Sequence, residues 1–361
     1  MVASTQFCNI VPPHILSRLA SGEDPAAAEA ARSTLKHDAD FFVVPEEDQH
    51  LLEVFPDLRK IPDHVAPEPT PSEGKLEREV SDARKRTEVP GRTVWSNDDK
   101  LRLDVDADRA YHTIGGMFEF FDKAYGRNSI DGAGLPMNAT VHYGKAYLNV
   151  FWDGERVRVG DGDGSIIRSF SLRCEPVGHA FTHAIIRYAS DLAETGQSGA
   201  LNESLADVFA ALMWQRSINQ TAEEADWLIG ANVFGDGVKG TALRSLKAPG
   251  TAYDDDRIGK DPQPSTMKGY VDTSEGHGGI YINSGIPNHA FYLTAHELGG
   301  YAWERAGQIW YDALTGGKLA PDCDFTGFAR LTVDTAQARY GEGVEARAVR
   351  NAWNQVGVSP S

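Results

Sequence analysis

Residues 177–211 read VGHAFTHAIIRYASDLAETGQSGALNESLADVFAA, and the spacing of their side chains decides the fold. Apolar residues recur at helical spacing around His179 and His183, so both imidazoles lie on one face of a predicted helix. After a glycine-containing break, a second helical pattern over 200–213 carries Glu203. Two histidines one turn apart and a carboxylate on the next helix suit a tetrahedral Zn²⁺.

Several motifs resemble one family. HxxxH followed by GALNESLADVF is similar to the motif of the thermolysin family of zinc metallopeptidases, HExxH and then NExxxD on the next helix. VHYGKAYLNVFWDG (141–154), YINSGIPNHAFYL (281–293) and AVRNAWNQVGV (348–358) resemble it too, so the resemblance extends from about Lys75 to Val358. It implies an α+β fold with a β-rich N-terminal lobe and a helical C-terminal lobe, joined by the zinc-binding helix, behind a short helical propeptide.

The resemblance divides the chain into a propeptide (1–62), a linker or processing region (63–78), a β-rich catalytic lobe that includes the zinc helix (79–190) and a helical catalytic lobe (191–361). The opening NIVPPHILSRL resembles the short propeptides of protealysin-like members, and we expect two helices there. Pro, Glu and Ser dominate 63–78, which favours an exposed linker. The propeptide is expected to inhibit its own enzyme; a helical extension without function is the alternative.

The resemblance also implies site residues. It implies zinc ligands at His179, His183 and Glu203, supporting side chains at Asn202 and Asp207, a substrate-binding edge strand at Asn149, Val150, Phe151 and Trp152, a carbonyl-binding Arg244, and an apolar S1′ pocket at Ile229, Val233 and Leu243. The edge strand would bind the substrate backbone by β-augmentation. Packing in the core is the simpler alternative for Trp152 and for the pocket residues. Cys8 is either a thiolate that caps the zinc or, more simply, a small packed residue.

Ala180 stands where the family has the glutamate that deprotonates zinc-bound water. A methyl group cannot accept a proton, so we expect crippled chemistry with zinc binding intact. The chain is then either an engineered Glu→Ala variant or a natural pseudopeptidase that binds peptides or inhibitors. The intact ligand set favours the engineered variant. A purely structural zinc protein is disfavoured, because structural sites are usually closed by four ligands rich in Cys.

Two other departures concern the groups that stabilise an oxyanion. By ungapped count, the family's tyrosine falls on Glu194 and its histidine on Tyr281. Tyr281 can still donate a hydrogen bond, whereas an ionised Glu194 would repel the oxyanion. His277 is a candidate substitute donor, with a solvated loop histidine as the alternative. These departures favour the pseudopeptidase or an altered specificity.

The calcium ligands of the family are incomplete here. Glu175 and Asp226 match two ligands of its double calcium site, but Trp214, Leu228 and Ala231 occupy other ligand positions. Too few oxygens remain for Ca²⁺, so we expect that double site to be absent.

The chain has 361 residues, 41% hydrophobic and 24% charged, with a net charge of −17. This composition predicts a globular protein and disfavours nucleic acid and membranes as partners. The resemblance implies peptide or protein substrates, and we expect a monomer. No apolar run is long enough for a membrane span. The N-terminus lacks the features of a Sec signal peptide and the three cysteines form no framework, so we expect a cytoplasmic protein or one exported without such a signal.

For the remaining elements, the patterns predict a hairpin over 78–95, a helix over 106–126, one strand over 140–154, mainly helical structure after the zinc helices including 220–234 and 241–250, a helix start at HELGG (296–300), and three closing helices within 304–316, 325–341 and 344–358.

Overall fold

The computed structural model describes residues 9–42, 75–97, 104–190 and 192–360. Its helices are α1 (Pro13–Ala20), α2 (Pro25–Phe42), α4 (Val105–Tyr125), α5 (Glu175–Ala189), α6 (Gly196–Ser217), α7 (Gly276–Asn283), α8 (Gly285–Leu298), α9 (Ala306–Thr315), α10 (Phe325–Tyr340) and α11 (Val344–Gln355). Its strands are β1 (Arg78–Asp82), β2 (Arg92–Ser96), β3 (Met137–Val141), β4 (Val150–Trp152), β5 (Arg156–Val159), β6 (Leu228–Ile229), β7 (Arg244–Ser245), β8 (Asp254–Asp255) and β9 (Gly259–Lys260).

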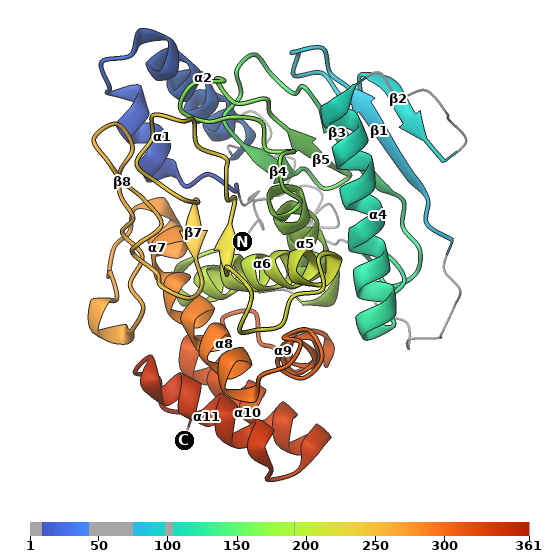
Figure 1. Ribbon diagram of the computed structural model, residues 1–361, viewed down its shortest axis with the longest axis vertical. Helices are drawn as coiled ribbons and strands as arrows, with labels where there is room; N and C mark the ends of the chain where they lie inside the picture. The colour runs from blue at the N-terminus through green and yellow to red at the C-terminus, as the bar shows by residue number, and fades with distance from the viewer. Residues whose placement is uncertain (1–8, 43–74, 98–103, 191, 361) are drawn as a thin grey trace, which may run out of the picture.

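The main sheet has the strand order β2-β1-β3-β5-β4. β1 and β5 run parallel to β3, whereas β2 and β4 pair antiparallel with their neighbours. The helix α4 packs against β1 and β3 (Figure 1). It begins where the Asp104 carboxylate accepts the Asp106 and Ala107 N–H groups, and it ends at Gly126, whose φ of 68° suits a glycine cap.

The helices α5 and α6 pack together between the sheet and a C-terminal bundle of α8 to α11 (Figure 1). α10 packs on α9 and α11, and α11 packs on α8. The buried side chains join both halves in one large apolar cluster, which includes Phe121, Phe209 and Trp310. The expected α+β architecture, β-rich at one end and helical at the other, is therefore confirmed.

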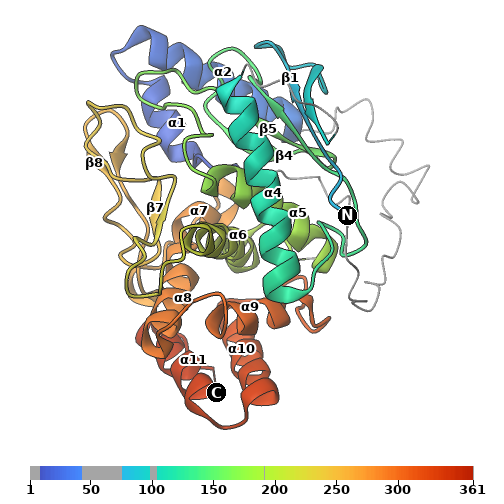
Figure 2. The same ribbon diagram turned by 45° about the vertical axis from the view of Figure 1, so that its right-hand side comes forward.

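The N-terminal helices α1 and α2 pack on each other at the end of the molecule opposite α10 and α11, as both views show (Figures 1 and 2). The two expected N-terminal helices, the hairpin β1–β2, the helix α4 and the three closing helices are all present. Cys8 and residues 63–74 of the predicted linker lie outside the described residues. No helix in the described part is long and apolar enough to cross a membrane.

The single strand expected over 140–154 is wrong. β3 ends at Val141, and only Val150–Trp152 form β4. The backbone between them turns through left-handed conformations at His142 (φ 53°) and Ala146 (φ 50°), which cannot continue a strand. The period-two pattern of this stretch therefore reflects a buried loop.

The helices expected over 220–234 and 241–250 are wrong as well. These segments form turns and a pair of short strands, β6 and β7. Trp227 (φ 57°) and Asn232 (φ 66°) have left-handed backbones that no α-helix accommodates. The apolar residues of these segments, such as Ile229 and Leu243, are buried, but turns and short strands place them in the core. Their helix-like spacing in the sequence therefore does not reflect a helix. HELGG is also the end of a helix and not its start, because α8 stops at Leu298 and Gly299 has a φ of 65°.

Candidate metal centre and substrate cleft

The two histidines of α5 and the glutamate of α6 meet in the core. The Nε2 atoms of His179 and His183 lie 2.9 Å apart. Each also lies 3.6 Å from an oxygen of Glu203. All three side chains are buried, and among the described residues this is the buried group whose donor atoms could share one ion.

The surroundings of the histidines leave their Nε2 lone pairs facing one another. His183 Nδ1 lies 2.9 Å from the Asn202 Oδ1 atom, and His179 Nδ1 lies 2.9 Å from an oxygen of Asp207. Both neighbours are acceptors, so the protons belong on the Nδ1 atoms and the Nε2 atoms are bare. Two bare nitrogens at 2.9 Å repel each other, and a cation bound by both removes that repulsion. The residues therefore fit Zn²⁺, and Asn202 and Asp207 lie beside the Nδ1 atoms of the two histidines.

Asp207 is the centre of a buried charge network. Its carboxylate accepts two hydrogen bonds of 2.8 Å from Arg244 and one of 3.0 Å from Asn288 Nδ2. Burial by itself would raise the pKa of Asp207, but the charge of Arg244 and the contact with His179 outweigh it and hold that pKa well below its usual range. Asn288 was missed from the sequence, although it lies in the motif 281–293.

Ala180 occupies the position of the expected general base. It follows His179 on α5 and is fully buried. Its methyl group offers no proton acceptor beside the ligand set.

The cleft along β4 is filled by residues 9–11 of the chain itself. The Ile10 N–H donates to the Val150 carbonyl (3.1 Å), and Arg244 donates to the Ile10 carbonyl (2.8 Å). The Asn149 side chain bonds Val11 at both ends, accepting from its N–H (2.9 Å) and donating to its carbonyl (3.3 Å). The segment thus extends the free edge of the sheet, as β-augmentation requires.

A second contact comes from α2. The carboxylate of Asp38 accepts hydrogen bonds from the Asn9 side chain (3.1 Å), from Asn149 Nδ2 (3.4 Å) and from the Tyr147 hydroxyl. One turn earlier, the Thr34 hydroxyl accepts the Leu148 N–H (3.1 Å). The helix α2 therefore covers the chain just before β4, and neither of its two contact residues was predicted from the sequence.

The apolar residues predicted to line S1′ are buried in the same cluster as Ile10. That cluster contains Ile229, Val233 and Leu243, which are between 0% and 2% exposed. The occupant of the cleft and the predicted pocket walls therefore belong to one continuous apolar region.

The predicted aromatic residues of the edge strand differ in burial. Phe151 is buried with Tyr143 and Tyr147, and the His37 ring of α2 lies 6.3 Å from it. Trp152 is half-buried, with its ring 6.3 Å from that of Tyr188. The Phe151 ring therefore lies beside His37 of α2, whereas the Trp152 ring lies beside Tyr188 of α5.

The three residues expected near an oxyanion differ in their surroundings. The Tyr281 hydroxyl accepts the Asn9 N–H at 3.2 Å, so this residue lies at the cleft. Burial raises the pKa of Glu194 to about 8, partly opposed by the charge of Arg187, so this carboxyl is mostly protonated at neutral pH. His277 is exposed on a left-handed turn.

An arginine stands between Glu175 and Asp226, the two residues expected to match calcium ligands of the family. The Arg173 guanidinium pairs with Glu175 (2.6 Å) and with Asp226 (2.9 Å), and it lies 4.3 Å above the Trp214 ring. Burial raises the pKa of Glu175 to about 7, an effect that Arg173 limits. The chain's own cation neutralises both carboxylates, which supplies a physical reason to expect no double calcium site.

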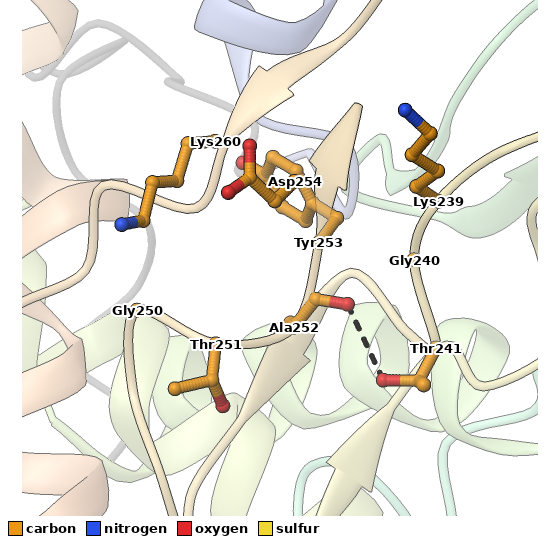
Figure 3. A pocket seen from close by; sticks show the side chains of 9 residues that line it. All are labelled: Lys239, Gly240, Thr241, Gly250, Thr251, Ala252, Tyr253, Asp254 and Lys260. Carbon is orange, nitrogen blue, oxygen red and sulfur yellow. Dashed lines mark hydrogen bonds between the residues drawn. The ribbon is translucent and has the colours of Figure 1, made fainter. Parts of the chain in front are cut away.

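A separate surface hollow of about 430 Å³ lies among residues 239–241, 250–254 and 260 (Figure 3). Lys239 and Lys260 stand on opposite sides of it, and their ammonium ends point in different directions (Figure 3). At its wall, the hydroxyl of Tyr253 bonds His14 of α1 at 2.7 Å. The hollow contains none of the predicted ligands, and its charges do not converge.

The class of protein that this fold and site define is a zinc metallopeptidase. Three protein ligands for zinc, in place of four, are typical of catalytic sites. Two family models match the chain. "Thermolysin metallopeptidase, catalytic domain" covers residues 73–187, and "Thermolysin metallopeptidase, alpha-helical domain" covers residues 190–358. The chain belongs to the thermolysin family of metallopeptidases.

Individual relatives cover nearly the whole chain. The "Extracellular metalloprotease" of Pectobacterium carotovorum subsp. carotovorum is 42% identical, over 98% of this chain and 97% of its own. "Protease PrtS" of Photorhabdus sp. (strain Az29) is 37% identical, over 99% and 94%. The solved structure of the "Precursor of Protealysin, Metalloproteinase from Serratia proteamaculans" superposes with a TM-score of 0.86 at 42% identity, covering 98% of this chain and all of that one. The resemblance drawn from the motifs is thereby confirmed, including its protealysin-like branch.

Proposed function

We propose that the chain is the precursor of a zinc endopeptidase that hydrolyses peptide bonds before bulky apolar residues, and that Ala180 cripples it in this form. One observation carries the proposal: residues 9–11 occupy the cleft beside a buried His–His–Glu ligand set and bond both β4 and Arg244. A propeptide (1–62), a linker (63–78) and two catalytic lobes (79–190 and 191–361) form the proposed domain organisation.

Each side chain at the cleft has a distinct proposed role. His179, His183 and Glu203 would hold Zn²⁺, which would act there as a Lewis acid toward a carbonyl oxygen and toward water. Arg244 and Asn149 hold the substrate backbone, as they hold residues 10 and 11 here.

The oxyanion is the proposed target of two further donors. The Tyr281 hydroxyl already lies at the cleft, where it meets the Asn9 N–H. Glu194 is mostly protonated at neutral pH, because its pKa is about 8, and a protonated carboxyl donates a hydrogen bond as a tyrosine does. His277 is exposed and takes no part in this proposal.

The N-terminal segment is the proposed intramolecular inhibitor. A substrate cannot pair with β4 while Ile10 bonds Val150, nor reach Asn149 while Val11 and Asp38 contact it. Peptides and proteins are the proposed substrates of the released enzyme, which we propose to be a monomer. The Pectobacterium relative is an extracellular metalloprotease, which favours export of this chain over a cytoplasmic location.

The test is the Ala180→Glu variant, compared with Ala180→Gln as the matched control. A glutamate restores the proton acceptor, whereas a glutamine of nearly the same shape does not. Intact-mass spectrometry after expression should reveal a cut within 63–78 in the glutamate variant only. Zinc content should be equal in both. A zinc-loaded Ala180→Glu protein that stays uncut and cleaves no peptide would contradict the proposal.

The second candidate is a natural pseudopeptidase that binds peptides or inhibitors. The replacement of two oxyanion groups, at 194 and 281, favours it, since neither change is needed to inactivate an enzyme that already lacks its base. Tight capture of uncut peptides, together with inactivity of the Ala180→Glu variant, is the outcome that would select this candidate.

A further inference from the structure

We propose that the N-terminal segment presents its Asn9–Ile10 peptide bond to the metal centre as a substrate bond, so that the active form of the enzyme cuts its own chain there. This processing site is distinct from the linker at 63–78. The inference rests on the proposed endopeptidase function.

The residues after the bond are clamped on both sides of the backbone. The N–H of Ile10 is bound by β4, and the carbonyl of Ile10 is bound by Arg244. Arg244 donates to both oxygens of Asp207, and one of these oxygens also lies 2.9 Å from Nδ1 of the ligand His179. The Arg244–Asp207 ion pair therefore links the Ile10 carbonyl to the metal ligand His179, and that carbonyl already accepts a hydrogen bond from a charged donor.

The following residue is clamped as completely. Asn149 accepts the N–H of Val11 and donates to its carbonyl. Pro12 and Pro13 come next, and Pro13 begins α1. The fixed φ of proline makes the path into that helix rigid. The chain after Asn9 thus cannot slide along β4 without breaking these bonds together.

The residue before the bond is held by other groups. The Asn9 N–H donates to the Tyr281 hydroxyl, and its side chain donates to Asp38 of α2. Asn9 is only 4% exposed, yet its carbonyl oxygen accepts no hydrogen bond from the described residues. A buried carbonyl without a donor is costly. The carbonyls of Ile10 and Val11 each accept a hydrogen bond from a described side chain, whereas that of Asn9 does not. The Asn9 carbonyl oxygen is therefore the one that a cation at the neighbouring metal centre could bind.

The reaction is a simple hydrolysis. A glutamate at position 180 accepts a proton from water, the hydroxyl adds to the Asn9 carbonyl carbon, and the proton passes to the Ile10 nitrogen as the C–N bond breaks. One water is consumed and no electrons are exchanged. The products are a peptide of residues 1–9 and a chain that begins at Ile10. The new chain stays in the cleft, because Val11, α1 and α2 still hold it, so this cut alone does not release the inhibitor.

The first experiment follows the full-length Ala180→Glu protein by intact-mass spectrometry over time. We expect the loss of residues 1–9 to be first order. The fraction of molecules cut per unit time should not depend on protein concentration, because the bond is presented within the same molecule. The matched variants add Ile10→Pro, which removes the N–H bound by Val150, or Ile10→Leu, which keeps it. The proline variant should lose the cut at Asn9 but keep the cut in 63–78; the leucine variant should keep both.

The outcomes separate this inference from the proposed function. A protein cut in 63–78 that retains residues 1–9, or that is cut after Ile10 instead, overturns the inference and leaves the endopeptidase standing. A zinc-loaded protein cut at neither place contradicts both. If the fraction of molecules cut per unit time rises in proportion to protein concentration, one molecule cuts another. That outcome also overturns the inference.

The second experiment uses the uncut Ala180 protein and needs no activity. Asn9–Ile10 is the one Asn–Ile pair in the sequence, and Ile10–Val11 is the one Ile–Val pair. Paired ¹³C-carbonyl and ¹⁵N labelling therefore gives a single resonance for each carbonyl. On titration with Zn²⁺ alone, the Asn9 carbonyl should shift and the Ile10 carbonyl, bound by Arg244, should shift less. An unmoved Asn9 carbonyl, or a larger shift at Ile10, overturns the proposed register.

Discussion

Replacing Arg173 with methionine should destabilise the protein in a strongly pH-dependent way. Methionine keeps the packing over the Trp214 ring but removes the charge between Glu175 and Asp226. The Glu175 side chain is completely buried, and Asp226 is 40% exposed. Most of the loss therefore falls on Glu175, which would remain in the core without a charged partner.

The magnitude follows from the protonation of Glu175. Removing one partner of a buried ion pair costs about 3–5 kcal/mol. Glu175 has a pKa of about 7, so it can escape part of that cost by taking up a proton, at about 1.4 kcal/mol for each unit between its pKa and the ambient pH. We therefore expect a loss of about 2–3 kcal/mol near pH 8. Near pH 5 the Glu175 carboxyl is already neutral. Only about 1 kcal/mol should then be lost, from the exposed ion pair with Asp226 and from the cation–π interaction with Trp214.

The sign agrees with proton linkage. The folded pKa of Glu175 lies above its ordinary value, so its contribution to stability is full in acid and is lost as the pH rises through about 7. Without Arg173 that pKa rises further, which extends the loss to higher pH.

Urea denaturation of the Ala180 protein and of the variant, at both pH values, measures the difference. The matched control is the double variant Arg173→Met/Glu175→Gln, which has no carboxyl at position 175. The extra loss of stability near pH 8, relative to pH 5, should be absent from this double variant. An equal loss of stability near pH 5 and near pH 8 would refute the reasoning, and so would recovery of the single variant by millimolar calcium.

Three further predictions concern the site and the core. Asp207→Asn should weaken zinc binding about 10–100-fold, because His179 loses its charged partner; unchanged affinity in a chelator competition would show that the contact is not used. Asp38→Ala should speed hydrogen exchange at the Ile10 amide, because Asp38 bonds both Asn9 and Asn149 to α2. Thr34→Val, which loses one bond to Leu148, should have a smaller effect. Equal protection in the parent protein and in both variants would contradict this role of Asp38. Trp353→Phe should cost about 1 kcal/mol in urea denaturation through the lost bond to Thr332, and altered zinc content in that variant would disprove a purely structural role.

Much of the metal centre could be predicted from the sequence because its geometry is local. His179 and His183 are one turn apart on α5, and Glu203 and Asp207 are one turn apart on α6, so helical periodicity alone gives each pair a common face. The same periodicity predicted α4 and the closing helices correctly. Local pattern failed where burial came from irregular backbone, as at His142 and Trp227, whose left-handed conformations leave no trace in apolar spacing.

The partners of these groups depended on contacts between distant segments. Asn288 reaches Asp207 across 81 positions, and Arg244 reaches the Ile10 carbonyl across 234. Asp38 and Arg173 are ordinary charged residues in sequence, and nothing in their neighbours marks the first as a contact of the cleft or the second as the cation between two carboxylates.

By itself, then, the sequence determined the family, the two ligand helices and the alanine at position 180, because these depend on residue identity and on repeats of a few positions. Only the tertiary structure decided which segment fills the cleft, in which register it lies, and which charges neutralise the buried carboxylates. Hydrogen bonds and ion pairs of this kind form between groups that folding brings together, and their energies depend on burial and distance, which no short pattern of residues encodes.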